Sequence, residues 1–239
     1  INPLYYLTFI DKEKRIAYAP SIGYNNISPE ISDVFTDYVN DIKYLSVREK
    51  HGANLIKEAT GRNAQVVIDP SLLLTKRQWE KEIQKFGKKL YQGKRYIFCY
   101  FLGKNPDYVK YALKLAEFAQ CTLVAVESKH APLNSVKRIL ADPIDFLCLI
   151  NNAEYILTDS FHGVALSINF GKQFATFKRF KDNDPICQNS RIYNILEKTH
   201  LENRLITIET PMSFFTKEII DYELADGLLT EERKSSLDY

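Results

Sequence analysis

Short, continuous apolar runs alternate with segments of helical periodicity along most of this chain. The runs at residues 96–101, 122–126 and 155–157 lack the polar alternation of a strand with one solvated face. Strands of this kind belong to parallel sheets that helices cover on both faces. The expected strands are residues 15–19, 44–47, 65–68, 96–101, 122–126, 155–158 and 173–177, and the expected helices are residues 29–39, 51–60, 75–86, 107–119, 143–151, 164–170 and 214–229. The sequence therefore predicts an α/β fold.

A basic, glycine-bearing stretch at residues 87–95 separates two such series. A solvated loop is the ordinary interpretation of this stretch, which is also the best position for a domain boundary. We expect a partial N-terminal Rossmann-like domain at residues 1–86, a basic linker at residues 87–95, and a C-terminal Rossmann-like domain with a helical tail at residues 96–239. The two domains are expected to face a cleft. Because the first series has few strands and begins abruptly, we expect the N-terminal domain to be incomplete in this chain.

Composition and charge exclude several classes of protein. The net charge is +2 over 239 residues, so the total charge predicts binding neither to nucleic acid nor to an anionic membrane. The longest apolar run, residues 96–102, is too short to span a bilayer, and no secretory signal is visible. The chain starts at Ile1, which fits a fragment or a processed chain, and the expected compartment is cytoplasmic.

The cysteines and histidines do not have the spacing of a metal site. Four cysteines are widely separated without a C-x-x-C pair, and Cys99, Cys121 and Cys148 lie in apolar runs, which favours core positions. Three of the four histidines, at positions 51, 130 and 200, are interpreted as surface residues. We therefore expect no bound metal and no cofactor.

The turn at residues 158–163, Thr-Asp-Ser-Phe-His-Gly, is the strongest candidate for a functional site. It follows an expected strand and precedes an expected helix, so His162 and Asp159 should stand at the carboxyl end of a strand, where open α/β sheets bind ligands. The start of the helix would also favour an anion. The alternative is that Asp159 or Ser160 only caps the helix and His162 only packs.

Three further turns follow expected strands, at residues 20–23, 48–49 and 69–71. Arg48 could hold a carboxylate or phosphate bidentately, or it could form an ion pair with Glu49. Asp69 precedes a proline and is more often a turn former than a catalyst. The candidate binding residues of these turns are Ser21, Gly23, Arg48, Glu49 and Asp69.

A basic group lies just past the last expected strand. It comprises Lys172, Lys178, Arg179 and Lys181, and it alternates with phenylalanines, so it is either an edge strand with a solvated face or a phosphate clamp near His162. Arg191 opens the C-terminal region and could reach the same place. The amphipathic segment at residues 214–229 is expected to pack onto the core rather than to form a partner surface.

Taken in order, these segments resemble the polysaccharide pyruvyl transferase family. The matching pieces are residues 15–23 (RIAYAPSIG), 45–49 (LSVRE), 67–74 (VIDPSLLL), Trp79, 145–163 (DFLCLINNAEYILTDSFHG), 167–168, 172–174, 191–192 and 201–204 (LENR). The resemblance implies a two-domain fold similar to the GT-B glycosyltransferases. It also implies transfer of a pyruvyl group from phosphoenolpyruvate to two hydroxyls of a surface or capsular saccharide, whose precursor could be lipid-linked.

The resemblance assigns roles to two of the candidate residues and exposes one departure. His162 matches the active-site histidine of the family, and Arg48 matches an arginine implicated in donor binding. Ketal-forming members are similar to Arg-Leu-His-Gly at the turn, whereas this chain has Ser160, Phe161, His162 and Gly163. Arg179 or Arg191 could supply the cation that is absent at position 160.

The expected chemistry uses His162 as a general acid or base, and Asp159 either orients it or accepts a proton from the sugar. Two other functions stay open at this point. One is a GT-B glycosyltransferase that uses a nucleotide sugar, in which the same turn would hold a nucleotide phosphate. The other is a saccharide-binding module without catalysis. The acceptor sugar and the oligomeric state are not predicted from the sequence.

Overall fold

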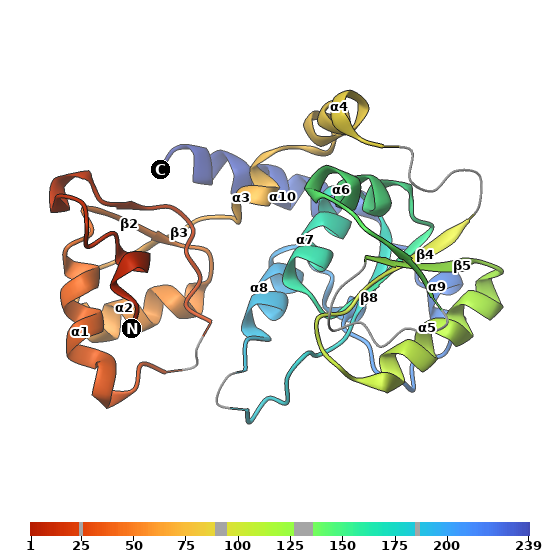
Figure 1. Ribbon diagram of the computed structural model, residues 1–239, viewed down its shortest axis with the longest axis horizontal. Helices are drawn as coiled ribbons and strands as arrows, with labels where there is room; N and C mark the ends of the chain where they lie inside the picture. Colours follow the sequence, from red (N-terminus) through yellow and green to blue (C-terminus); the bar gives the residue numbers. More distant parts are fainter. Residues whose placement is uncertain (24–25, 89–94, 127–135, 185–186) are drawn as a thin grey trace. The chain divides into compact units, whose positions relative to one another are not determined.

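The computed structural model describes residues 1–239 except 24–25, 89–94, 127–135 and 185–186, and it divides the chain into two compact units (Figure 1). Unit 1 comprises residues 1–73, 180–194 and 230–239, and unit 2 comprises residues 74–179 and 195–229. Two segments that we expected in the C-terminal domain, 180–194 and 230–239, thus belong to the first unit, and residues 74–86, which we expected in the N-terminal domain, belong to the second. Most of the expected linker, and His130, lie outside the described residues.

Unit 1 is built on a small parallel sheet with the strand order β1-β2-β3. Its other elements are short turns of 3₁₀ helix and α-helices. In chain order the elements are η1 (Pro3–Tyr6), η2 (Lys12–Lys14), β1 (Ile16–Ala17), α1 (Pro29–Asn40), β2 (Tyr44–Val47), α2 (Lys50–Thr60), β3 (Gln65–Val66) and α3 (Pro70–Leu73). As expected, Pro29 is the first residue of α1 and Gly61 ends α2 in a left-handed conformation.

The core of unit 1 lies between the sheet and its two long helices. It consists of Phe35, Val39, Ile42, Leu45, Val47 and Ile56. The end of the chain also packs into this unit, because the Ser236 hydroxyl accepts the Ile68 N–H (2.9 Å) and the Tyr239 hydroxyl donates to the Ala17 carbonyl (3.2 Å). Residues more than 160 positions apart in sequence, Ile68 and Ser236, are thereby joined.

Unit 2 is built on a parallel sheet with the strand order β6-β5-β4-β7-β8. Its elements, followed by those of the C-terminal region, are α4 (Lys76–Phe86), β4 (Tyr96–Tyr100), α5 (Pro106–Ala119), β5 (Thr122–Val126), β6 (Lys137–Ile139), α6 (Pro143–Asn152), β7 (Tyr155–Thr158), α7 (Phe161–Asn169), β8 (Gln173–Thr176), α8 (Ser190–Lys198), η3 (Glu202–Arg204), α9 (Phe214–Lys217) and α10 (Tyr222–Leu237). Helix α8 and helix α10 each contain residues of both units.

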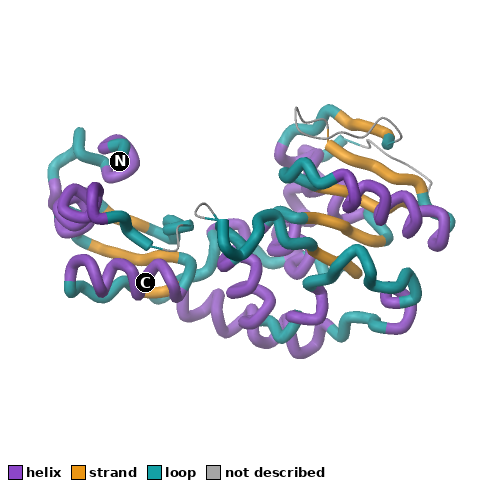
Figure 2. Tube along the Cα trace, turned by 90° about the horizontal axis from the view of Figure 1, so that it is seen from below, coloured by secondary structure: helices purple, strands orange, loops and turns teal. Residues whose placement is uncertain are grey.

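Helices cover both faces of this sheet (Figures 1 and 2). On one face, Ile97, Leu157 and Ala175 pack with Leu115 of α5 and Phe215 of α9. On the other face, the Phe98 and Tyr100 rings contact Phe146 of α6, and α7 packs along β7 and β8. Strands buried on both faces explain the continuous apolar runs, so the expected α/β class with parallel sheets is confirmed.

The register places the carboxyl ends of three strands in one row. Tyr100 of β4 is opposite Thr158 of β7, and Thr158 is opposite Thr176 of β8. The residues that follow these three positions therefore leave the sheet at the same edge. The turn at residues 158–163 and Arg179, which lies three residues past Thr176, belong to this edge.

Several elements differ from the expectations. Strand β6 was not expected, because its sequence, Lys-Arg-Ile, carries the charges of an edge strand, and helix α8 was not expected although Ile192, Ile195 and Leu196 recur at helical spacing. The expected helix at residues 214–229 is broken into α9 and α10, since the Gln173 side chain binds the backbone N–H and C=O of Ile220 between them. A tertiary contact thus interrupts a pattern that looks continuous in the sequence.

Candidate functional site

The turn between β7 and α7 is organised around the buried Thr158 hydroxyl. This hydroxyl donates to the Tyr100 carbonyl (2.6 Å) and accepts the Ser160 N–H (3.0 Å). Ser160 occupies the N-cap position of α7, but its side chain makes no capping hydrogen bond. The turn is therefore fixed by Thr158 and not by capping from Ser160.

Gly163 is required by the close approach of α7 to β7. A Cβ atom at this position would lie 2.2 Å from the Thr158 Oγ1 and 2.9 Å from the Thr158 Cβ. Both atoms belong to a fully buried side chain, so neither can move aside at low cost. Gly163 therefore has a structural role and does not need to contact a ligand.

His162 is the exposed member of the turn. It is the second residue of α7, and its ring contacts that of Phe161 at 5.3 Å between centroids. From Gly163 to Asn169 the helix is buried throughout. A buried helix thus presents one imidazole to solvent at the carboxyl edge of the sheet, where it can act as an acid or base on a bound molecule.

Asp159 holds the loop that follows β4. Its Oδ1 accepts the Leu102 N–H (2.7 Å) and its Oδ2 accepts the Gly103 N–H (2.8 Å), while the residue is only 1% exposed. Burial raises the pKa of this carboxyl, although the two amides and Arg179 act in the opposite direction. Both oxygens are occupied by backbone groups.

Arg179 lies beside this carboxylate. Its Cγ is 3.7 Å from the position of a Cβ atom on Gly103. Burial and the charge of Asp159 raise the pKa of the nearby Tyr100 hydroxyl, and the charge of Arg179 opposes this increase. Lys172, another member of the sequence-predicted basic group, has a different role. Its ammonium donates to the Asn151 carbonyl (2.9 Å) near the end of α6, and burial lowers its pKa. Lys172 therefore caps a helix, whereas Lys178 and Arg179 are exposed.

The second group of candidate residues forms a buried ionic cluster in unit 1. The Arg48 guanidinium pairs with Glu49 (3.0 Å) and with Asp69, and the Ser21 hydroxyl donates to the Glu49 Oε1 (2.7 Å). Asp69 also accepts the N–H and the hydroxyl of Ser71 (2.9 and 2.7 Å). The ion pair between Arg48 and Glu49, one of the two sequence-based alternatives, is thus confirmed. Two carboxylates around one guanidinium do not favour an anionic ligand.

Gly23 and Arg191 both lie against Gln188 in unit 1. A Cβ atom on Gly23 would be 3.2 Å from the Gln188 side chain, and Arg191 donates to the Gln188 carbonyl (3.5 Å) and to its side-chain oxygen. The sequence-predicted residues are therefore distributed over both units. Unit 1 holds Ser21, Gly23, Arg48, Glu49, Asp69 and Arg191, and unit 2 holds Asp159, Ser160, His162, Gly163 and Arg179.

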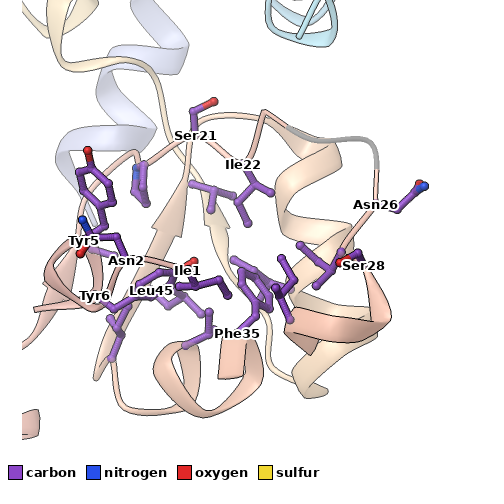
Figure 3. A pocket seen from close by; sticks show the side chains of 18 of the residues that line it. Ile1, Asn2, Tyr5, Tyr6, Ser21, Ile22, Asn26, Ser28, Phe35 and Leu45 are labelled. Carbon is purple, nitrogen blue, oxygen red and sulfur yellow. The ribbon is translucent and has the colours of Figure 1, made fainter. Parts of the chain in front are cut away.

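Unit 1 also contains a hollow of about 1320 Å³ beside β1 (Figure 3). Ile22, Asn26, Phe35 and Leu45 are among the residues that line it (Figure 3). The hydroxyl of Ser21 is used by Glu49. The apolar lining belongs to the core of the unit. Of the residues in the ionic cluster, Ser21 borders the hollow, whereas Arg48, Glu49 and Asp69 do not.

The described residues contain no group of three or more His, Cys, Asp or Glu side chains arranged to hold a metal ion. None of the helices in the described ranges is long and apolar enough to cross a membrane. Cys99, Cys148 and Cys187 are buried free thiols and Cys121 is half-buried.

The sequence interpretation missed the loop that follows β4. This loop contains Gly103 and Lys104, and it touches the turn at residues 158–163 through Asp159. The available signal was a glycine directly after an apolar strand. The hydrogen bonds to Asp159, which join positions more than 50 residues apart, could not be seen in the sequence.

Comparison with solved structures supports the fold class. The chain is similar to the UDP-GlcNAc 2-epimerase from Neisseria meningitidis bound to UDP-GlcNAc (TM-score 0.50, 14% identity) and to that from Methanocaldococcus jannaschii (TM-score 0.50, 13% identity). Each comparison covers 90% of this chain and 68% of the other. The GT-B-like fold expected from the sequence is therefore confirmed, and identities this low show the fold alone.

Two further comparisons bear on length and on sequence. The chain spans 44% and 62% of the first two solved structures that it matches, a glycotransferase of kitacinnamycin and a second structure of the M. jannaschii epimerase. No curated protein matches the chain significantly. The family model for polysaccharide pyruvyl transferase matches residues 2–179, which include both the ionic cluster and the turn with His162. This chain belongs to the polysaccharide pyruvyl transferase family.

Proposed function

We propose that this protein transfers the pyruvyl group of phosphoenolpyruvate to two hydroxyls of a saccharide, which yields a cyclic ketal and inorganic phosphate. The observation that carries the proposal is the position of His162. It is the exposed residue of a turn whose other members are buried or half-buried, at the carboxyl edge of the parallel sheet, from which the chain also continues to the exposed Arg179. Family membership supports a transferase that acts on a polysaccharide.

The proposed reaction needs one proton at carbon and two nucleophilic oxygens. Protonation of the methylene carbon of phosphoenolpyruvate leaves an oxocarbenium-like centre at C2, which one sugar hydroxyl attacks with loss of its proton. The second hydroxyl then replaces phosphate at C2 and closes the ketal ring. His162 is proposed to donate the proton to carbon or to accept the hydroxyl proton, since an imidazole nitrogen can act as either a proton donor or a proton acceptor. Arg179 is proposed to stabilise the departing phosphate.

The geometry favours different anion-binding groups from those expected for the family. Arg48 already pairs with two buried carboxylates, so we do not assign it to the donor. Its truncation would remove a cation that is ion-paired with two buried carboxylates, and breaking a buried ion pair destabilises a protein by about 3–5 kcal/mol. A loss of donor binding in such a variant would therefore not identify a contact between Arg48 and the donor.

The test compares two exposed histidines of unit 2, His162→Asn and His200→Asn. His200 has a left-handed backbone conformation, which asparagine tolerates, so it is a matched control. Phosphate release from phosphoenolpyruvate is measured with a panel of diol-bearing sugars, and the ketal is identified by mass spectrometry. We expect a loss of about a hundredfold or more for His162→Asn and no change for His200→Asn. Full turnover in a folded His162→Asn variant would exclude the proposed role.

A further inference from the structure

The sheet of unit 2 reverses its winding direction between β4 and β7. The chain first proceeds outward from β4 through β5 to β6, and then returns to the other side of β4 with β7 and β8. In open α/β sheets, ligands bind outside the carboxyl ends of the strands at this reversal. Residues 101–105 follow β4 and the turn at residues 159–160 follows β7, so both segments border that position. The function proposed for His162 concerns the turn after β7, whereas residues 101–105 have no proposed function so far.

The first segment has a rigid path that Asp159 and Gly103 determine together. The Asp159 carboxylate accepts the N–H groups of both Leu102 and Gly103, at 2.7 and 2.8 Å. A Cβ atom on Gly103 would lie 2.7 Å from the Asp159 Oδ2, so another residue at this position would push the loop off the carboxylate. A buried acid is thus used to hold two consecutive backbone amides at the edge of the sheet.

Two exposed cations lie where this loop meets the end of β8. The Arg179 side chain passes 3.7 Å from the Cβ position of Gly103, and Lys104 is the next residue of the loop. Both residues are exposed. Phosphoenolpyruvate carries a phosphate and a carboxylate, and a guanidinium with an ammonium is a suitable pair of partners for two such groups.

We propose that Lys104 and Arg179 together bind the anionic groups of the donor, and that Asp159 is a positioning residue that holds the Lys104 loop for this purpose. The identity of the donor rests on the function proposed above. The anion site itself is independent of it, because any phosphate-bearing donor would meet the same two cations.

The first experiment measures donor affinity by titration calorimetry with phosphoenolpyruvate. We expect Lys104→Ala and Arg179→Ala each to weaken binding by about tenfold or more, the usual effect of removing one charge-assisted hydrogen bond. Arg179→Lys should recover part of the loss. Lys114→Ala is the matched control, since it removes the same charge from an exposed position on α5 and should bind normally. Unchanged affinity in both test variants would overturn the proposed pair.

The second experiment tests the positioning role with a double-mutant cycle. If Asp159 acts through the loop, Asp159→Asn weakens donor binding, and adding Lys104→Ala to it has a smaller effect than Lys104→Ala alone. The combination of Asp159→Asn with Lys114→Ala should be additive. A purely structural defect, or a role as a base in the reaction, would leave both combinations additive and would overturn the positioning role.

Two provisions keep these tests decisive. If Asp159→Asn does not fold, Gly103→Ala displaces the same loop while the carboxylate remains, and it should show the same non-additivity with Lys104→Ala. UDP is titrated in parallel. If UDP binds with the same dependence on Lys104 and Arg179 while phosphoenolpyruvate does not bind, the anion site is supported and the pyruvyl donor is excluded. If phosphoenolpyruvate binds equally well to all variants, the site is overturned and the donor stands.

Discussion

The residues of the turn at 158–163 form one motif in the sequence, but they have separate roles in the structure. Thr158 joins β7 to β4 through its hydroxyl and leaves no space for a side chain at position 163. Asp159 turns away to the loop after β4, and His162 alone is exposed to solvent. One residue of the turn is thus exposed to a bound molecule, while its neighbours determine where that residue stands.

Replacement of Gly163 by alanine should therefore destabilise unit 2. The new methyl group would overlap the Thr158 side chain, and overpacking of this kind costs about 1–3 kcal/mol. Gly227→Ala is the control, because this exposed helical glycine has nothing within 4 Å of its Cβ position and alanine should stabilise α10 by up to about 1 kcal/mol. Urea denaturation measures both changes. Equal stability of the two variants would contradict the close approach of α7 and β7.

At the scale of elements, the C-terminal region is attached to unit 2 by hydrogen bonds to its backbone. The Gln173 side chain accepts the Ile220 N–H (3.1 Å) and donates to the Ile220 carbonyl (3.5 Å). The Tyr222 hydroxyl donates to the Lys172 carbonyl, and the buried Arg204 donates to the Glu218 carbonyl. These contacts explain why the helical pattern of residues 214–229 is interrupted, since backbone groups of Glu218 and Ile220 are bonded to other elements.

We expect Gln173→Ala to release this attachment locally. The Ile220 amide should lose protection in hydrogen-exchange measurements, and the free energy of unfolding should fall by about 1–3 kcal/mol because a buried backbone group loses its partner. Gln84→Ala, at an exposed position in α4, should change neither quantity. Retained protection at Ile220 would show that the side chain of Gln173 is not what holds this segment.

At the scale of the whole molecule, the buried core contains ionisable groups that stay neutral. Burial raises the pKa of the Cys99 thiol from 9.0 to about 12 and that of Tyr111 from 10.0 to about 12. In the unfolded chain these groups would ionise at their ordinary values. Their contribution to stability is therefore complete below pH 9 and is lost progressively as the pH rises toward 12.

The resulting prediction is a decline of stability in alkaline solution. Between pH 9 and pH 12 the unfolded state binds fewer protons than the folded state, so the urea midpoint should fall as the pH increases. Alkylation provides a residue-specific check. At pH 9 the thiol of Cys99 should be protected in the folded protein and should react once urea unfolds it, while the half-buried Cys121 reacts first. Rapid native alkylation of Cys99 would contradict this account.

Much of the fold followed from local patterns. Strands β2, β5 and β7 begin and end at the expected residues. The start of α1 at Pro29 and the end of α2 at Gly61 were marked by residues with strong local preferences. These features depend on neighbours within a few positions, which the sequence displays directly. Edge strand β6 was missed, because a partly solvated strand carries charges that mask the pattern.

The sequence by itself determined the α/β class and the family, and it placed the turn that carries His162 between a strand and a helix. Only the tertiary structure decided that Arg48 is paired with Asp69 as well as with Glu49, that Asp159 is bonded to Leu102 and Gly103, and that the chain returns twice to unit 1. The physical reason is the range of the interactions. Periodicity and turn preferences act over a few residues, whereas a charged side chain takes its role from whichever partners the fold brings within hydrogen-bonding distance.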